Sequence, residues 1–232
     1  MKAMILAAGR GERMRPLTDA TPKPLLAAAG KPIIVWTIEA LARAGFRDIV
    51  INVSHLGGQI EAALQDGRRW DVSIRYSREA EPLETAGGIA TALPLLGGEP
   101  FIVVNGDIHT DFDFARLRAF GREPGVDLAH LVLVDNPAHH PSGDFGLHDG
   151  RLANDGNARY TFSGVGAYRS GLFEAIAPHT KAQLATLLRP QIDAGRVSGE
   201  LHRGRWSDIG TPERLRDLGA VLAGSTNKVK AD

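Results

Sequence analysis

Short apolar runs alternate with helical patterns through the first half of this 232-residue chain, and this alternation restricts the folds open to it. Buried strands are predicted over Ala3–Ala8, Asp48–Val53 and Phe101–Asn105, because each is a short, mainly apolar run bounded by turn residues. Apolar residues then recur at helical spacing over 35–42, and Gly45 supplies a stop. Strands that alternate with helices usually pair in parallel. The pattern predicts an α/β chain with a Rossmann-like, doubly wound, mostly parallel mixed sheet.

Shorter patterns predict the remaining elements. Further strands are predicted over 73–76, 128–134, 145–147, 151–152 and 160–168, and further helices over 56–64, 88–96, 172–176, 183–194 and 212–222. Asp149-Gly150 is a hairpin turn signal. We expect a single domain over residues 1–223, followed by a disordered polar tail over 224–232.

Composition excludes several classes of function. The chain has no cysteine, which excludes a disulfide scaffold, a Cys-ligated metal centre and a Cys nucleophile. It has 27 Lys and Arg residues and 27 Asp and Glu residues, a balance untypical of proteins that bind nucleic acid or anionic membranes. No apolar run approaches the length of a membrane span or of a signal peptide. We therefore expect a cytoplasmic protein with no nucleic acid and no membrane among its partners.

The turn after the first strand carries the strongest chemical signal. Gly9 and Gly11 follow the strand one residue apart, and glycines there let backbone amides approach a phosphate chain. Residues 1–23 contain five cations and two acids, a local charge of +3 in a chain of zero net charge. This combination predicts a polyphosphate-binding turn. The alternative is an ordinary turn between strand and helix with solvated arginines.

Two familiar phosphate motifs do not fit this turn. The dinucleotide fingerprint needs a third glycine where this chain has Met14. A Walker A loop needs Ser or Thr after Gly-Lys, but Gly30-Lys31 is followed by Pro32. A plain dinucleotide-dependent dehydrogenase and a P-loop phosphotransferase are therefore both disfavoured.

Three further segments are candidates for the same site. Asp107 directly follows the strand ending at Asn105, where a carboxylate could bind a divalent cation or could form an Asx turn. Asp208 precedes a helix that Thr211 caps, and it is either a second metal ligand or a turn former. Gly87-Gly88 opens a predicted helix, which could aim amides at a ligand or could merely need small residues.

Several motifs, in their order along the chain, resemble those of the sugar-1-phosphate nucleotidyltransferase family. The family's L-A-A-G-x-G-T-R-L-x-P, P-K, E-P-L-G-T-A-G, G-D and W-x-D-x-G-T correspond to residues 6–16, 22–23, 81–87, 106–107 and 206–211. Glu12 stands where the family has threonine, and Met14 where it has leucine. The resemblance covers about residues 1–222 and implies the nucleotide-diphospho-sugar transferase type of fold. It also implies a nucleotide half over about 1–110 and a sugar-phosphate half over about 111–223.

Within the family, the stretches 130–137, 143–145 and 161–164 resemble most the members that transfer a uridylyl group to N-acetylmuramate 1-phosphate in bacterial cell-wall recycling. The resemblance implies a reaction of UTP with a sugar 1-phosphate, giving a UDP-sugar and pyrophosphate with Mg²⁺ as cofactor. The E-K-P motif, with which many relatives hold the sugar phosphate, is absent. Guanylyl transfer to mannose 1-phosphate, or transfer to another hexose 1-phosphate, is the alternative.

The same resemblance implies the site residues. The catalytic set is Arg13, Lys23 and Asp107, and the metal ligands are Asp107 and Asp208. The nucleotide-binding set is Ala8, Gly9, Gly11, Glu12, Arg13, Lys23, Glu79 and Gly88. For the sugar-phosphate pocket, where this chain lacks the family's E-K-P motif, we expect Asn105, Asp144, Gly146, Asn154 and Ser163.

A different class of function is a non-catalytic regulatory protein that binds a sugar nucleotide. Such a protein could lose a metal-binding carboxylate and keep the glycine turn, whereas this chain has both Asp107 and Asp208. An enzyme acting on two small-molecule substrates is the preferred interpretation. The sequence does not indicate an oligomeric state.

Overall fold

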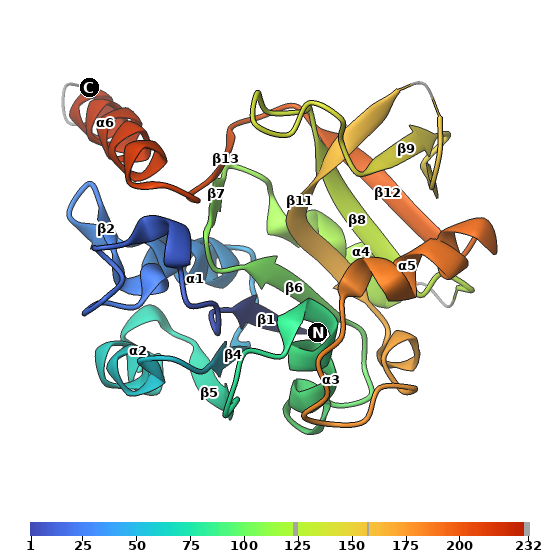
Figure 1. Ribbon diagram of the computed structural model, residues 1–232, viewed down its shortest axis with the longest axis horizontal. Helices are drawn as coiled ribbons and strands as arrows, with labels where there is room; N and C mark the ends of the chain where they lie inside the picture. The colour runs from blue at the N-terminus through green and yellow to red at the C-terminus, as the bar shows by residue number, and fades with distance from the viewer. Residues whose placement is uncertain (123–124, 157, 230–232) are drawn as a thin grey trace.

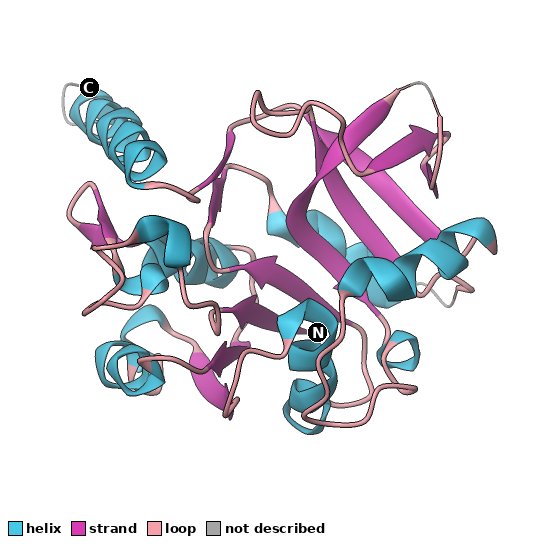
Figure 2. Ribbon diagram, in the orientation of Figure 1, coloured by secondary structure: helices cyan, strands magenta, loops and turns pink. Residues whose placement is uncertain are grey.

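A nine-stranded mixed sheet with helices on both faces runs through the described part of the chain, residues 1–122, 125–156 and 158–229 (Figures 1 and 2). The structure is a computed structural model. The strand order is β5-β4-β1-β6-β11-β8-β12-β10-β9. The pairs β5–β4, β4–β1, β1–β6 and β8–β12 are parallel, whereas β11 and β10 run against their neighbours. The predicted mixed α/β sheet is confirmed, with its parallel pairs mainly in the first half of the chain and antiparallel pairs prevailing in the second.

The first half of the chain forms the all-parallel part of this sheet. β1 lies between β4 and β6, so that Ile5 is opposite both Ile51 and Val104. Because successive side chains of a strand point to opposite faces, Ile5 packs into one helical layer and Met4 into the other. The four strands are β1 (Lys2–Leu6), β4 (Asp48–Val53), β5 (Ser73–Arg78) and β6 (Phe101–Asn105).

Helices cover both faces of these strands. α1 (Ile33–Arg43) and α2 (Gly57–Leu64) share a buried cluster with Ile5, and α3 (Glu84–Leu96) packs on the opposite face with Met4. α3 begins at Glu84, four residues before its predicted start, so the Gly87-Gly88 pair lies inside its first turns. The carboxyl ends of β1, β4, β5 and β6 therefore lie at one edge of the sheet, where the loops toward the helices begin.

The second half continues the same sheet. β11 inserts between β6 and β8 with the opposite direction, and α5 (Leu184–Asp193) packs with the cluster beneath it. The remaining strands are β8 (Ala129–Val134), β9 (Phe145–His148), β10 (Arg151–Ala153), β11 (Arg159–Tyr168) and β12 (Val197–His202). β12 was not predicted, because Gly199 and Glu200 interrupt its apolar pattern.

The predicted helix over 172–176 is wrong. The chain forms a single 3-10 turn, η5 (Ser170–Leu172), followed by further turns. Phe173 is completely buried, with its ring centroid 6.1 Å from that of Phe101 and 5.7 Å from that of Tyr168. The apolar residues of this segment place one aromatic ring in the core and do not form a helix face.

Two short sheets bring distant segments together. β7 (Ile108–Thr110) pairs antiparallel with β13 (Trp206–Asp208), and β2 (Ala27–Ala28) pairs with β3 (Lys31–Pro32). Figure 1 shows β7 and β13 side by side, with the chain then passing into α6 (Pro212–Val229) near β2. Because β7 directly follows β6, this pairing carries a late segment of the sequence to the strand ends of the first half.

The remaining elements are short. They are η1 (Glu12–Met14), η2 (Lys23–Leu25), η3 (Arg68–Trp70), η4 (Phe114–Leu117) and α4 (Arg118–Arg122). α6 continues to Val229, beyond its predicted end at Leu222, and includes residues of the predicted tail. Residues 230–232 of that tail lie outside the described residues. Among the helices of the described residues, none has both the length and the apolar character that crossing a bilayer requires.

Candidate active site

A cavity of about 450 Å³ opens where β1, β4, β5 and β6 end. Ligands of open α/β sheets bind at this edge, outside the carboxyl ends of the strands. The turn after β1 and the start of α3 form opposite parts of its wall, and Gly210 contributes from the segment before α6. The predicted site residues that line it are Ala8, Gly9, Gly11, Glu12, Arg13, Lys23, Glu79, Asn105 and Asp107.

The turn after β1 has the backbone that its two glycines predict. A Cβ atom at Gly9 would lie in open space, so this residue leaves room on the cavity side. Gly11 has φ of 66°, a left-handed conformation that favours glycine, and a Cβ there would approach the Thr18 side chain to 2.9 Å. The Thr18 hydroxyl donates to the Gly11 carbonyl at 2.8 Å, and the amide of Met14 donates to the same oxygen at 2.8 Å. The turn is therefore fixed from inside the protein.

Two of the predicted cations lie on this wall. Arg13 is part of η1, and Lys23 begins η2 between two prolines that set its backbone. The Lys23 side chain is only 11% exposed, and its Nζ lies 2.5 Å from Oδ2 of Asp107. A mostly buried ammonium beside a carboxylate is held in one place, so the charge of Lys23 is presented at a fixed point of the cavity.

The β7–β13 pairing brings Asp208 to Asp107. Asp208 lies opposite Ile108, the residue after Asp107, and the amide of Ile209 donates to the Asp107 carbonyl at 2.7 Å. Asp208 is not part of the cavity wall. Its carboxylate bonds to Arg214 of α6, and its Oδ1 lies 3.2 Å from Nε2 of His139.

The donors at this position fit a hard divalent cation. The described residues contain no group of three or more His, Cys, Asp or Glu side chains that could enclose a metal ion. The β7–β13 pairing instead supplies two carboxylates on neighbouring segments, Asp107 and Asp208. Mg²⁺ is usually held by one or two carboxylates, and water and substrate phosphates complete its shell. Both carboxylates are paired with cations, Asp107 with Lys23 and Asp208 with Arg214.

Glu79 closes the cavity at its other end, next to the start of α3. It is 5% exposed, its Oε1 accepts from Nδ2 of Asn52 at 2.7 Å, and its Oε2 accepts from the amide of Leu83 at 3.0 Å. Burial raises the pKa of Glu79 above its ordinary value, and the two hydrogen bonds oppose that rise. Gly88 does not line the cavity, because it packs behind this pair.

The amides at the start of α3 are used inside the protein. Those of Ala86 and Gly87 donate to the carbonyl of Ala182 at 3.0 and 3.2 Å. A Cβ at Gly87 would come within 2.1 Å of the Thr180 carbonyl, so glycine here allows the 180–182 segment to pack against the helix. The Gly-Gly pair therefore serves packing on both sides of the helix.

Four predicted sugar-phosphate residues lie away from the cavity wall, toward the far strands of the sheet. Asp144 accepts from the amide of Phe162 at 2.8 Å, and a Cβ at Gly146 would lie 2.8 Å from the Asp155 carbonyl. Asn154 bonds to α5, and the hydroxyl of Ser163 donates to the Val132 carbonyl at 2.7 Å. Each of these side chains, or the space at the glycine, is already occupied by a partner within the protein.

Sequence reasoning missed several residues of the site. Asn52 lines the cavity at 3% exposure, and a lone Asn in the apolar run DIVINV was the available signal. Thr18, Arg214 and His139 had no such signal, because their roles arise from contacts with Gly11 and Asp208 in the folded chain.

Comparisons with known proteins agree with this geometry. A family model described as nucleotidyl transferase matches residues 2–223. The N-acetylmuramate alpha-1-phosphate uridylyltransferase of Neisseria meningitidis serogroup B is 56% identical over 231 residues, covering 97% of this chain and 99% of that protein. Mannose-1-phosphate guanyltransferase beta-A of Xenopus laevis is 31% identical over 224 residues, and the match covers 92% of this chain and 62% of that protein.

Solved structures show the same fold at low identity. A crystal structure described as a glucose-1-phosphate thymidylyltransferase of Bacillus anthracis has a TM-score of 0.84 at 21% identity, covering 95% of this chain and 94% of that chain. HddC of Yersinia pseudotuberculosis has a TM-score of 0.79 at 22% identity, covering 95% of this chain and 99% of that chain. With a family model matched along almost its whole length, this chain belongs to the nucleotidyl transferase family.

Proposed function

We propose that this chain transfers the uridylyl group of UTP to N-acetylmuramate 1-phosphate, giving a UDP-sugar and pyrophosphate, as a step of cell-wall recycling. The observation that carries the proposal is the cavity at the strand ends, where the glycine turn, Arg13, Lys23 and Asp107 converge. The 56% identity over 97% of the chain to a uridylyltransferase of that substrate supports the choice of sugar and base.

The chemistry requires positioning and charge neutralisation. The attacking group is a phosphate oxygen of the sugar 1-phosphate, which is anionic at neutral pH, so no protein nucleophile or general base is required. Two unit negative charges about 4 Å apart repel by roughly 4 kcal/mol at an effective dielectric near 20. The cations on the cavity wall would lower this barrier by holding both polyanions in reacting geometry.

Several residues of the wall have a defined part in this scheme. Gly9 and Gly11 let the turn approach the triphosphate, and Arg13 neutralises the charge of the departing pyrophosphate. Lys23, fixed beside Asp107, faces the α-phosphate and the incoming sugar phosphate. Asn105, whose side chain packs against Gly164, bounds the cavity on the side of the second half, where we propose that the sugar binds.

Asp107 and Asp208 would hold Mg²⁺, which when bound supplies positive charge to the phosphate oxygens. Lys23 and Arg214 pair with these carboxylates, and since a carboxylate has several acceptor sites, each could contact the ion and keep its cation. We propose the cytoplasm as the location and the two small-molecule substrates as the partners. Asp144, Gly146, Asn154 and Ser163 stay predictions for the sugar side.

Glu79 favours a base that donates a ring N–H. A carboxylate only accepts hydrogen bonds, so it can accept from N3–H of uracil and equally from N1–H of guanine. For this reason guanylyl transfer to mannose 1-phosphate is the second candidate, in line with the 31% identity to a guanyltransferase.

The test is a pyrophosphate-release assay with UTP or GTP, each paired with N-acetylmuramate 1-phosphate or mannose 1-phosphate, with and without Mg²⁺. We expect the highest kcat/KM for UTP with N-acetylmuramate 1-phosphate, and activity only with the metal ion. A higher kcat/KM for GTP with mannose 1-phosphate would replace the proposed substrates. Undiminished release in the presence of a chelator would contradict the role of Mg²⁺.

A further inference from the structure

The side chain of Asn52 connects the two ends of the cavity. Its Oδ1 accepts from the amide of Ala7 at 2.8 Å, and its Nδ2 donates to Oε1 of Glu79 at 2.7 Å. Ala7 begins the turn after β1, and Glu79 follows β5, so β4 with Asn52 lies between the two segments that it joins. All three residues line the cavity.

The side chain at position 52 has to meet two opposite hydrogen-bonding requirements. Ala7 presents a donor and Glu79 presents an acceptor, so the side chain at position 52 must accept on one side and donate on the other. The planar amide of Asn does both. Asp of the same shape has no donor for Glu79 when ionised, and Leu of similar size has neither group.

The surrounding structure fixes the Asn52–Glu79 pair from two sides. The second oxygen of Glu79 accepts from the amide of Leu83, so both carboxylate oxygens have a fixed donor. Behind the pair, a Cβ at Gly88 would lie 2.8 Å from both Nδ2 of Asn52 and Oε1 of Glu79. Gly88 therefore has the role of leaving space for the Asn52–Glu79 hydrogen bond.

We propose that Asn52 is a positioning residue that sets the orientation of the Glu79 carboxylate and of the Ala7 amide together, so that base recognition and phosphate binding depend on one side chain. This inference rests on the proposed function, in which Glu79 faces the base and the turn after β1 binds the triphosphate. Neither Asn52 nor Ala7 needs to touch the reacting phosphorus for this role.

The test exchanges the donor and the acceptor between the two residues. In Asn52→Asp, two carboxylates face each other, and in Glu79→Gln, the amides of Asn52 and Leu83 compete for one oxygen. In the double variant, the new carboxylate at position 52 accepts from the new side-chain amide at position 79, whose oxygen accepts from Leu83, so every group is paired again. We expect each single variant to raise KM for UTP about tenfold or more, with kcat at saturating UTP changed less than about threefold. The double variant recovers most of the loss.

The pH dependence gives a second readout that a merely structural role would not move. In Asn52→Asp, a proton shared by the two carboxyls restores a donor at position 52, so KM for UTP falls as the pH is lowered from 8 to 6. In the wild type, KM for UTP does not fall over this pH range. The groups that face Glu79 and enter this comparison are Asn52, the Leu83 amide and the charge of His179.

A matched pair of glycine variants separates this contact from general effects of a methyl group in a helix. In Gly88→Ala of α3, the new Cβ pushes the Asn52–Glu79 pair apart, and KM for UTP rises. In Gly58→Ala of α2, the new Cβ has no atom within 4 Å, and KM for UTP is unchanged. Thermal unfolding of every variant is measured to show which of them fold. If Asn52→Asp does not fold, comparing KM for UTP between Glu79→Gln and the double variant is enough to test the proposal.

The outcomes are distinguishable. A double variant no better than Glu79→Gln, together with unchanged KM in Gly88→Ala, contradicts the positioning role of Asn52 while the wild type turns over UTP normally. Absence of pyrophosphate release from UTP by the wild-type chain contradicts the proposed function as well.

Discussion

At the residue scale, the two carboxylates proposed for Mg²⁺ are each held by a cation of the chain itself. Lys23 pairs with Asp107, and Arg214 pairs with Asp208, which also lies near His139. Each ion pair neutralises one carboxylate and holds its side chain in place. Lys23, which lines the cavity, also lies where it could donate to phosphate oxygens of a bound substrate.

Replacing Asp107 by Asn tests this arrangement with the smallest change of shape. We expect the chain to fold as before and kcat to fall by on the order of 10² or more, as happens when a charge-stabilising group is lost. Steady-state pyrophosphate release and the thermal unfolding midpoint are the measurements. Turnover like that of the wild type would remove Asp107 from the mechanism.

The two lysines near the glycine turn form a matched pair for a second prediction. Lys23 lines the cavity, whereas Lys31 pairs with Glu39 at 2.7 Å and lies 4.0 Å from the Trp36 ring centroid. Lys23→Ala should lower kcat/KM by on the order of 10², and Lys31→Ala by less than about threefold, because only Lys23 faces the phosphates. Equal losses in the two variants would indicate a general effect of surface charge.

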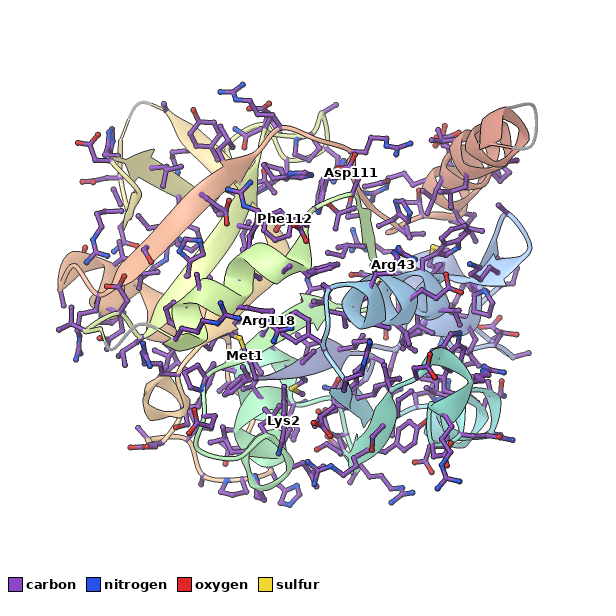
Figure 3. The ribbon with its side chains drawn as sticks, turned by 180° about the vertical axis from the view of Figure 1, so that it is seen from behind. Met1, Lys2, Arg43, Asp111, Phe112 and Arg118 are labelled. Carbon is purple, nitrogen blue, oxygen red and sulfur yellow. The ribbon has the colours of Figure 1, made fainter. Side chains whose placement is uncertain are left out.

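At the scale of elements, the β7–β13 pairing decides whether the site exists. It places Asp208 beside the end of β6, about 100 residues away along the chain. At the far end of β7, Asp111 bonds to His202 at 2.9 Å and to Arg205 at 3.2 Å, on either side of the loop from β12 to β13. Figure 3 shows Asp111 and Phe112 there, seen from behind. This contact fixes the segment that leads to Asp208.

Acid should weaken this contact. Burial raises the pKa of Asp111, but the hydrogen bonds from Arg205 and His202 outweigh it and hold the pKa below its ordinary value. A carboxyl with a lowered pKa in the folded state adds stability above its unfolded pKa of about 3.9 and loses it as the pH falls through the folded value.

Asp111→Asn should therefore lower the unfolding midpoint by about 1–3 °C at pH 7, with a smaller difference near pH 3. Thermal unfolding of both proteins at the two pH values measures this. A difference that grows toward low pH would show that Asp111 does not act through its charge.

Local sequence patterns predicted the elements that depend on local residues. Asp48–Val53 and Phe101–Asn105 form strands with the predicted bounds, because each run is apolar and enclosed by turn residues. β12 was missed because its pairing with β8, and not a local pattern, makes it a strand. The helix predicted over 172–176 was wrong because Phe173 is buried against Phe101 in the core. The glycine turn was visible as a motif. Asn52 was not singled out, because its role requires Ala7 and Glu79 as neighbours.

At the scale of the whole molecule, one sheet joins the two halves of the chain around the cavity. β1, β4, β5 and β6 supply the base and phosphate end, while β11 and β8 continue the sheet on the side of the proposed sugar. β13 and α6 return from the end of the chain to the first half (Figure 1). The site therefore forms only when the whole chain is folded.

The most direct test of the central claim is anomalous X-ray diffraction from crystals of the chain with UTP and Mn²⁺ in place of Mg²⁺. The account predicts a manganese peak bound by the carboxylates of Asp107 and Asp208, with the triphosphate lying on the turn over residues 8–13. A manganese peak away from both carboxylates, or a triphosphate bound outside this turn, would contradict it.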